Sequence, residues 1–235
     1  MRWHTWLVLA GGVALCGCRP DQATATQRLY DACEAKNLAG VKAAISEGAD
    51  VNSPRRDPQF GFSPLEVSTN APEIVAELLK QGAAPKKAGA QGYLPLGVAA
   101  VSGAAKSMEL ILKGGALLEG KDADGETALA QAVRNGRFDN AKLLISWGAN
   151  VNTKDRRGQT PLFHVVMTSR LNSVDRTELA KLLILRGANP LAKDIHGRTP
   201  LSYADTTQAR LTGVSQDLID LFPKPGDDVL PTISP

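Results

Sequence analysis

The chain is poor in the residue types that build most catalytic and metal sites. It has three histidines and three cysteines among 235 residues, and aromatic residues make up 5%. No cysteine pair or carboxylate cluster accompanies His164 and His196 at metal-ligand spacing. No G-x-S-x-G elbow is present, and the glycine-rich segment 114–120 lacks a phosphate-loop lysine. We therefore expect a protein that is not an enzyme and that holds neither a metal nor a cofactor.

Strong charge is also missing. The formal net charge is +3, which is too slight to indicate a nucleic-acid partner. The acidic segment 122–126 lacks the ligand series and terminal glutamate of a calcium loop. We interpret it as a hairpin tip.

The N-terminal segment carries an apolar run that is too short to cross a bilayer as a helix. The run extends from Leu7 to Leu15 and suits the hydrophobic region of a secretory signal. The following Leu15-Cys16-Gly17-Cys18 resembles a bacterial lipobox, which implies cleavage after Gly17 and lipidation of Cys18. A soluble secreted protein with a stray cysteine is the alternative.

This resemblance defines the first two segments and the location. Residues 1–17 would be the signal peptide, and residues 18–26 the lipidated cysteine with a polar tether. Arg19 follows the lipidated position, and the lack of aspartate there favours the outer membrane over the inner one. Beyond Cys18 the only cysteine is Cys33, which we interpret as a small buried residue rather than a reactive thiol.

The rest of the chain repeats one pattern with a period of about 33 residues. In residues 124–152, Thr127 is placed to cap a first helix with an apolar stripe, and Gly136 ends it. A second amphipathic run follows and stops at Gly148. Such a unit cannot bury its own apolar faces and needs neighbours of the same shape.

The openings and closures of the units carry the repeat. The openings read GFSPLEV, GYLPLGVAA, GETALAQAV, GQTPLFHVV and GRTPLSYA, and the closures read EGADVN, QGAAP, GGALLE, WGANVN and RGANP. These motifs resemble the T-P-L-H-x-A opening and the Gly-Ala closure of the ankyrin repeat. The resemblance implies an all-α solenoid of about six helix-turn-helix units joined by β-hairpin-like loops.

The predicted ankyrin domain covers residues 27–222, and residues 223–235 form a loose proline-rich tail. Near residues 167–178 the last regular unit has about six extra residues, which form either a loop on the binding face or longer helices. The predicted units are 27–57, 58–88, 89–121, 122–154, 155–193 and 194–222.

Stacked repeats offer an extended surface made of hairpin tips and the outer side of each first helix. We expect aromatic and arginine anchors on it to bind another protein. The predicted partner-binding residues are Phe60, Phe62, Tyr93, Gln131, Arg134, Asn135, Arg156, Arg157, His164, Arg198 and Tyr203.

The sequence thus predicts a monomeric, membrane-tethered binding module that faces the periplasm. One hypothesis is an inhibitor or immunity protein that neutralises a secreted toxic enzyme. The other is a scaffold or protective partner of a periplasmic enzyme, such as a catalase, or of envelope assembly. Both rest on analogy with the family.

Overall fold

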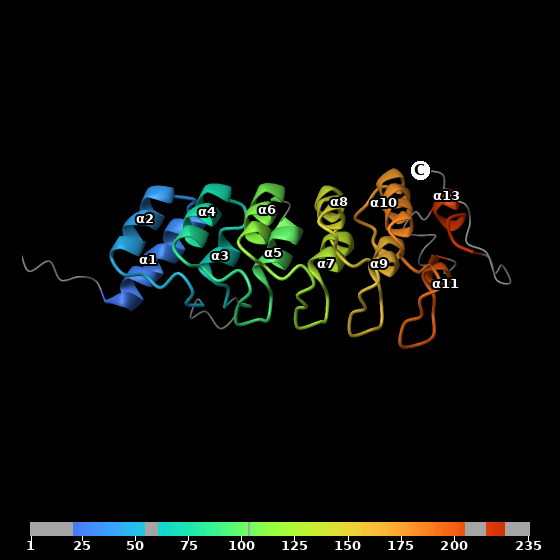
Figure 1. Cartoon of the computed structure of the whole chain (residues 1–235), viewed down its shortest axis with the longest axis horizontal. Helices are drawn as coiled ribbons and strands as arrows, with labels where there is room; N and C mark the ends of the chain where they lie inside the picture. The colour runs from blue at the N-terminus through green and yellow to red at the C-terminus, as the bar shows by residue number, and fades with distance from the viewer. Residues whose placement is uncertain (1–20, 55–60, 103, 205–214, 224–235) are drawn as a thin grey trace, which may run out of the picture.

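The computed structural model describes residues 21–54, 61–102, 104–204 and 215–223, and the helices in these ranges come mostly in antiparallel pairs (Figure 1). Within these ranges no strand forms, and a single isolated bridge joins Lys121 to Thr127. The pairs are α1 (Gln22–Glu34) with α2 (Leu38–Ser46), α3 (Pro64–Val67) with α4 (Pro72–Lys80), α5 (Pro95–Ser102) with α6 (Ala105–Lys113), α7 (Ala128–Arg134) with α8 (Phe138–Ser146), and α9 (Pro161–Met167) with α10 (Ser173–Leu185), followed by α11 (Pro200–Ala204) and α13 (Gln216–Ile219).

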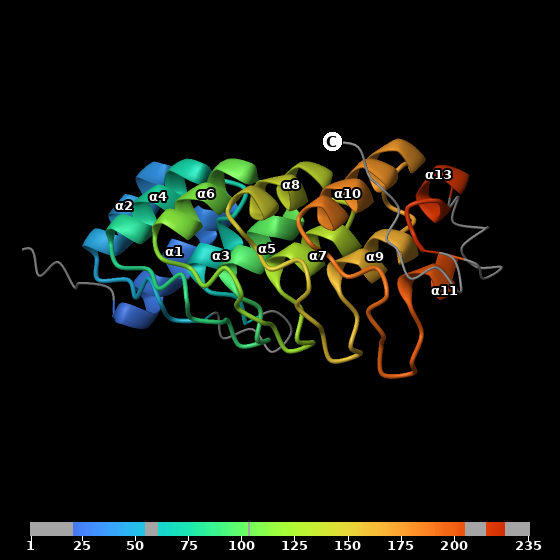
Figure 2. The same ribbon diagram turned by 45° about the vertical axis from the view of Figure 1, so that its right-hand side comes forward.

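The pairs stack side by side into an elongated array. Figures 1 and 2 show the second helices α2, α4, α6, α8 and α10 in one row. The first helices α1, α3, α5, α7, α9 and α11 lie in the row beneath it. The loops that join one pair to the next project as hairpins on the side away from the second helices. The array therefore presents a row of hairpin tips along one edge.

Local sequence signals set the helix ends. The Thr127 hydroxyl accepts from the N–H of Ala130, and Ser63 and Glu66 form a reciprocal capping box at the start of α3. Proline occupies the first position of α3, α5, α9 and α11, where its missing N–H costs nothing. Gly136 ends α7 with φ of 68°, as its place after the apolar stripe predicted.

Apolar side chains from neighbouring pairs share one continuous core. In α7, Leu129, Ala132 and Val133 are fully buried, and in α8 Leu144 is as well. Helix α7 packs against α5, α8 and α9, so its core stripe is covered by both neighbouring units. This confirms the expectation that a single unit depends on its neighbours.

Polar side chains also tie one unit to the next. The Asn152 Oδ1 accepts from the N–H of Asn189 at 2.8 Å, while its Nδ2 donates to the carbonyl of Gly187 at 2.8 Å. Asn52 makes the same two bonds to the following closure, at 2.7 and 3.0 Å. These asparagines come from the V-N that ends two of the closure motifs.

The predicted start of the repeat domain needs a correction, because a helix begins within residues 18–26, which were predicted to be a polar tether. Helix α1 begins at Gln22, with Asp21 accepting from the N–H of Thr24 at 2.7 Å. Ala25 is already part of the core. The N-cap aspartate and this buried alanine extend the first helix toward the N-terminus.

The extra residues of the last regular unit divide between a helix and a loop. Helix α10 has 13 residues, whereas α8 has 9, so four of about six extra residues lengthen the helix. The other two lengthen the preceding loop, residues 168–172. Thus both alternatives hold in part, although the first helix of this unit keeps the seven residues of α7.

The remaining sequence predictions concern single residues or segments. Cys33 is buried, and burial raises the pKa of its thiol, in agreement with an inert core residue. The signal peptide, Cys18, Phe60 and residues 224–235 lie outside the described residues.

None of the helices in the described part of the chain is both long and apolar enough to cross a membrane.

Candidate functional site

An aspartate begins each of three consecutive hairpins and holds its tip together. The Oδ1 atom of Asp155 accepts from the N–H groups of Arg157 and Gln159, both at 2.8 Å. Asp122 and Asp194 each make the equivalent pair of bonds, at 2.8 to 2.9 Å. Side-chain acceptors of this kind give the hairpin a local alternative to strand pairing.

The second oxygen of each aspartate faces the first helix of the same unit. Gln131 donates to Oδ2 of Asp122 at 2.6 Å, and the Tyr203 hydroxyl donates to Oδ2 of Asp194 at 3.2 Å. In the unit between them, Nε2 of His164 lies 3.4 Å from Oδ2 of Asp155. The three helix residues occupy equivalent positions, nine residues after their aspartates.

This arrangement corrects part of the predicted binding surface. Gln131 and His164 were expected to point outward, but each residue is only 4% exposed. The hairpin folds over this side of the helix, and a side chain there contacts the aspartate of its own unit. Helical periodicity alone does not reveal a cover supplied by an adjoining loop.

The tips are also joined to one another through the main chain. The N–H of Arg156 donates to the carbonyl of Asp124 at 3.1 Å, and the N–H of Ile195 donates to that of Arg157 at 3.0 Å. Arg156 and Arg157 themselves are exposed. Their side chains are therefore presented from a row whose backbone is held in place.

Glu126 is an acidic residue buried beneath this row. Its carboxylate is 2.8 Å from Nη2 of Arg134, the last residue of α7. Burial raises the pKa of Glu126, and the charges of Arg134 and His164 oppose that effect. Burial alone would also raise the pKa of Asp155, but the nearby His164 imidazole and the hydrogen bond from the N–H of Gln159 bring it below its ordinary value.

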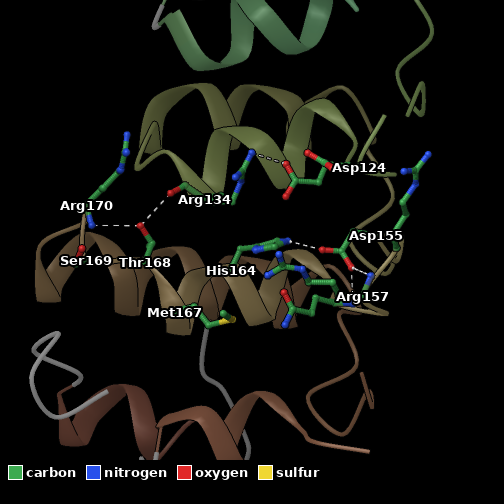
Figure 3. A pocket seen from close by; sticks show the side chains of 12 residues that line it. Asp124, Arg134, Asp155, Arg157, His164, Met167, Thr168, Ser169 and Arg170 are labelled. Atoms are coloured by element: carbon green, nitrogen blue, oxygen red, sulfur yellow. Dashed lines mark hydrogen bonds and ion pairs between the residues drawn. The ribbon is translucent and has the colours of Figure 1, made fainter. Parts of the chain in front are cut away.

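A cavity of about 360 Å³ lies between the units of α7 and α9 and brings these groups together (Figure 3). Its wall includes Thr168, in the loop that the extra residues of this unit lengthen. The Thr168 hydroxyl donates to the carbonyl of Arg134 at 3.1 Å. Figure 3 shows Arg134 and His164 entering the site from these two neighbouring units. The charged lining residues are Asp124, Glu126, Asp155, Arg134, Arg156, Arg157 and Arg170.

The predicted partner-binding residues fall into separate groups. The cavity is lined by Arg134, Arg156, Arg157 and His164, and Asn135 lies beside it, accepting from Arg170 at 3.2 Å.

The aromatic residues predicted at the N-terminal side do not contribute to the cavity. The rings of Phe62 and Tyr93 pack against each other at 6.2 Å between centroids, and Tyr93 is exposed. Beyond the other end, the Arg198 guanidinium pairs with Asp194 at 3.0 Å and lies over the Tyr203 ring. Arg198 and Tyr203 thus stabilise their own hairpin.

Sequence reasoning missed Glu126 and Asp155. We expected no carboxylates at ligand spacing from the two histidines, yet ligand atoms of Glu126, Asp155 and His164 lie within 4.8 Å of one another. His196 is exposed at another tip and is outside this group. The signal that could have found Asp155 is the recurrence of aspartate nine residues before Gln131, His164 and Tyr203.

The comparison with family models finds ankyrin repeats (3 copies) over residues 65–155 and 114–194, which together span more than half of the 235 residues. A comparison with curated proteins finds no match.

Proposed function

Because the chain belongs to the ankyrin repeat family, whose repeats imply protein–protein interaction, we propose that it is a binding module tethered to a bacterial envelope, where it inhibits a secreted toxic enzyme. The family is typically non-enzymatic. The partner in this proposal is a protein that inserts a protruding acidic loop into the cavity of units α7 and α9.

The observation that carries this proposal is the concentration of arginine around the cavity. Arg134, Arg156, Arg157 and Arg170 line it, against the three acidic residues Asp124, Glu126 and Asp155. Arginine is enriched among residues that dominate binding energy, and its planar group pairs with a carboxylate through two hydrogen bonds. A concave basic site between hairpin tips fits an acidic loop better than a flat surface does.

The tether in this proposal is the lipid on Cys18, supported by the lipobox-like residues 15–18. Gln22 begins α1, so only three residues lie between Cys18 and the helix. Three residues span at most about 11 Å. The repeat domain would therefore stand directly at the membrane surface, where an inhibitor meets an incoming enzyme.

Location is tested with the Cys18→Ala variant. We expect the wild-type protein in the membrane fraction with incorporated radiolabelled palmitate, and the variant without label in the soluble fraction. A wild-type protein that is soluble and unlabelled would contradict the tether, but not the binding site.

The binding site is tested by reversing charge at two exposed tip residues. We expect Arg156→Glu combined with Arg157→Glu to abolish co-purification of the partner from envelope extracts, because an acidic loop would then be repelled. Lys113→Glu is the matched control, since Lys113 is exposed on the last turn of α6, away from the tips. Equal recovery with all three proteins would refute the assignment of this surface.

Deleting the gene separates inhibition from scaffolding. Loss of an inhibitor should be toxic only in cells that also produce the partner enzyme, and the charge-reversed protein should fail to rescue them. A fall in the partner's amount without toxicity would instead support the scaffold hypothesis.

A further inference from the structure

Three side chains of metal-ligand type converge at the inner end of the cavity. They are the carboxylates of Glu126 and Asp155 and the imidazole of His164, whose side chains are only 5 to 6% exposed. One ligand atom from each lies within 4.8 Å of the others. The two tips and α9 therefore supply one nitrogen and two oxygen donors to a common point.

One buried polar atom in this group has unused hydrogen-bonding capacity. Among the described residues, Nε2 of His164 has no hydrogen-bond partner and only a 3.4 Å approach to Oδ2 of Asp155. The Glu126 carboxylate is held by its 2.8 Å ion pair with Arg134, which a metal ion would have to replace. Buried polar groups are ordinarily satisfied, so the histidine nitrogen points to a ligand.

We propose that Glu126, Asp155 and His164 bind a divalent transition-metal ion of the Zn²⁺ class. Imidazole is a ligand for Zn²⁺ and neighbouring metals, whereas Ca²⁺ and Mg²⁺ select oxygen ligands alone. At Zn–N and Zn–O bonds near 2.1 Å, tetrahedral ligands stand about 3.4 Å apart. The observed separations need side-chain shifts of about 1 Å to meet this geometry.

The surroundings prepare the ligands for an ion. Two backbone N–H groups hold Oδ1 of Asp155, which leaves Oδ2 directed at the site. The two carboxylates together balance a divalent charge. Arg134 is the present counter-ion of Glu126, and its side chain is 51% exposed, so it can swing into solvent when the metal binds.

The same three ligands occur once in the described array. The preceding unit has Gln131 where this one has His164, and the following unit has Tyr203. The position of Glu126, directly after the opening glycine, is taken by Gln159 and Arg198 in the next two units. The metal-binding chemistry is therefore a feature of this one junction and not of the repeat.

Three protein ligands would leave a fourth position for water, which could enter through the cavity that Glu126, Asp155 and His164 line. The inference goes beyond the proposed inhibition and is independent of it, because metal binding requires no partner protein.

The test titrates the full chain, stripped with EDTA, with ZnCl₂ in a calorimeter. The informative variant is His164→Gln, since glutamine at the equivalent position of the preceding unit already bonds to its hairpin aspartate. We expect the wild type to bind one Zn²⁺ that His164→Gln binds at least ~10-fold more weakly. His196→Gln, at an exposed tip, should bind as the wild type does.

Arg134→Gln distinguishes a metal site from a purely structural charge network. Removing the competing guanidinium should tighten Zn²⁺ binding, and an affinity no higher than that of the wild type would overturn the proposal. So would equal Zn²⁺ affinity in the wild type and His164→Gln.

Folding and ligand type are checked separately. Thermal melting in EDTA verifies that each variant is folded. If His164→Gln is not, Asp155→Asn takes its place, since its amide oxygen can still accept from the two backbone N–H groups. Co²⁺ should give a visible absorption spectrum in the wild type that the folded ligand variant lacks, and identical spectra would refute the ligand set.

Discussion

Replacing Asp194 with alanine should loosen the hairpin of the last regular opening. The Asp194 side chain is 1% exposed and accepts from the N–H groups of His196 and Arg198, from the Arg198 guanidinium and from the Tyr203 hydroxyl. A net contribution of about 1 kcal/mol per bond applies here, because the tip amides regain water when the carboxylate is lost. The exposed guanidinium adds little. We therefore expect Asp194→Ala to cost about 3 kcal/mol.

Asp194→Asn is the matched variant. Its amide oxygen can still accept from the two backbone N–H groups, so it should cost only about 1 kcal/mol. Hydrogen exchange of the His196 and Arg198 amides measures the effect locally. A loss of 3 kcal/mol corresponds to about 100-fold faster exchange in the alanine variant. Unchanged exchange at both amides would refute the role of the carboxylate.

The same aspartate predicts a pH dependence. Burial raises the pKa of Asp194, but hydrogen bonds from the backbone of Arg198 and His196 bring it below its ordinary value. A carboxyl with a lowered folded pKa stabilises the protein above its unfolded pKa of about 3.9 and loses this effect as the pH falls through the folded pKa. The difference in free energy of unfolding between the wild type and Asp194→Asn, measured in urea, should therefore be largest at pH 7 and vanish on acidification. An advantage that persists in acid would contradict the reasoning.

Two further changes test how the units are joined, with Lys142→Ala as a common control that should change stability by less than about 0.5 kcal/mol, since its ion pair is exposed. Asn152→Ala removes both bonds to the next closure, at Asn189 and Gly187. It should lower the free energy of unfolding in urea by about 2 kcal/mol. A loss equal to that of the control would show that the closures are held by packing alone. Leu144→Ala opens a cavity in the fully buried core. It should lower the free energy of unfolding by about 2 to 5 kcal/mol and also lower the melting temperature. A loss below about 1 kcal/mol would mean that neighbouring units collapse into the space.

Most of the repeat scaffold could be predicted because its signals are local. Thr127 caps α7 through an amide three residues away, and Gly136 supplies the positive φ that ends the helix. The proline within the opening motif marks the start of α3 and α9. Each signal depends on a few adjacent residues, and it repeats at a regular period.

The cavity could not be predicted in this way, because its residues meet only after two units stack. Glu126 belongs to one hairpin, whereas Asp155 and His164 belong to the next unit. The buried state of His164 depends on the hairpin that folds over α9. The sequence places it on the outer side of α9, but that side is covered by the hairpin, so the expected exposure was wrong.

The main-chain bonds that join successive tips, from Arg156 to Asp124 and from Ile195 to Arg157, have a consequence for how such a protein changes over time. Because carbonyl and amide groups form these bonds, substitutions of the exposed Arg156 and Arg157 side chains by residues other than proline leave the linkage intact. New recognition properties can thus be acquired one residue at a time on a frame that does not need to be rebuilt.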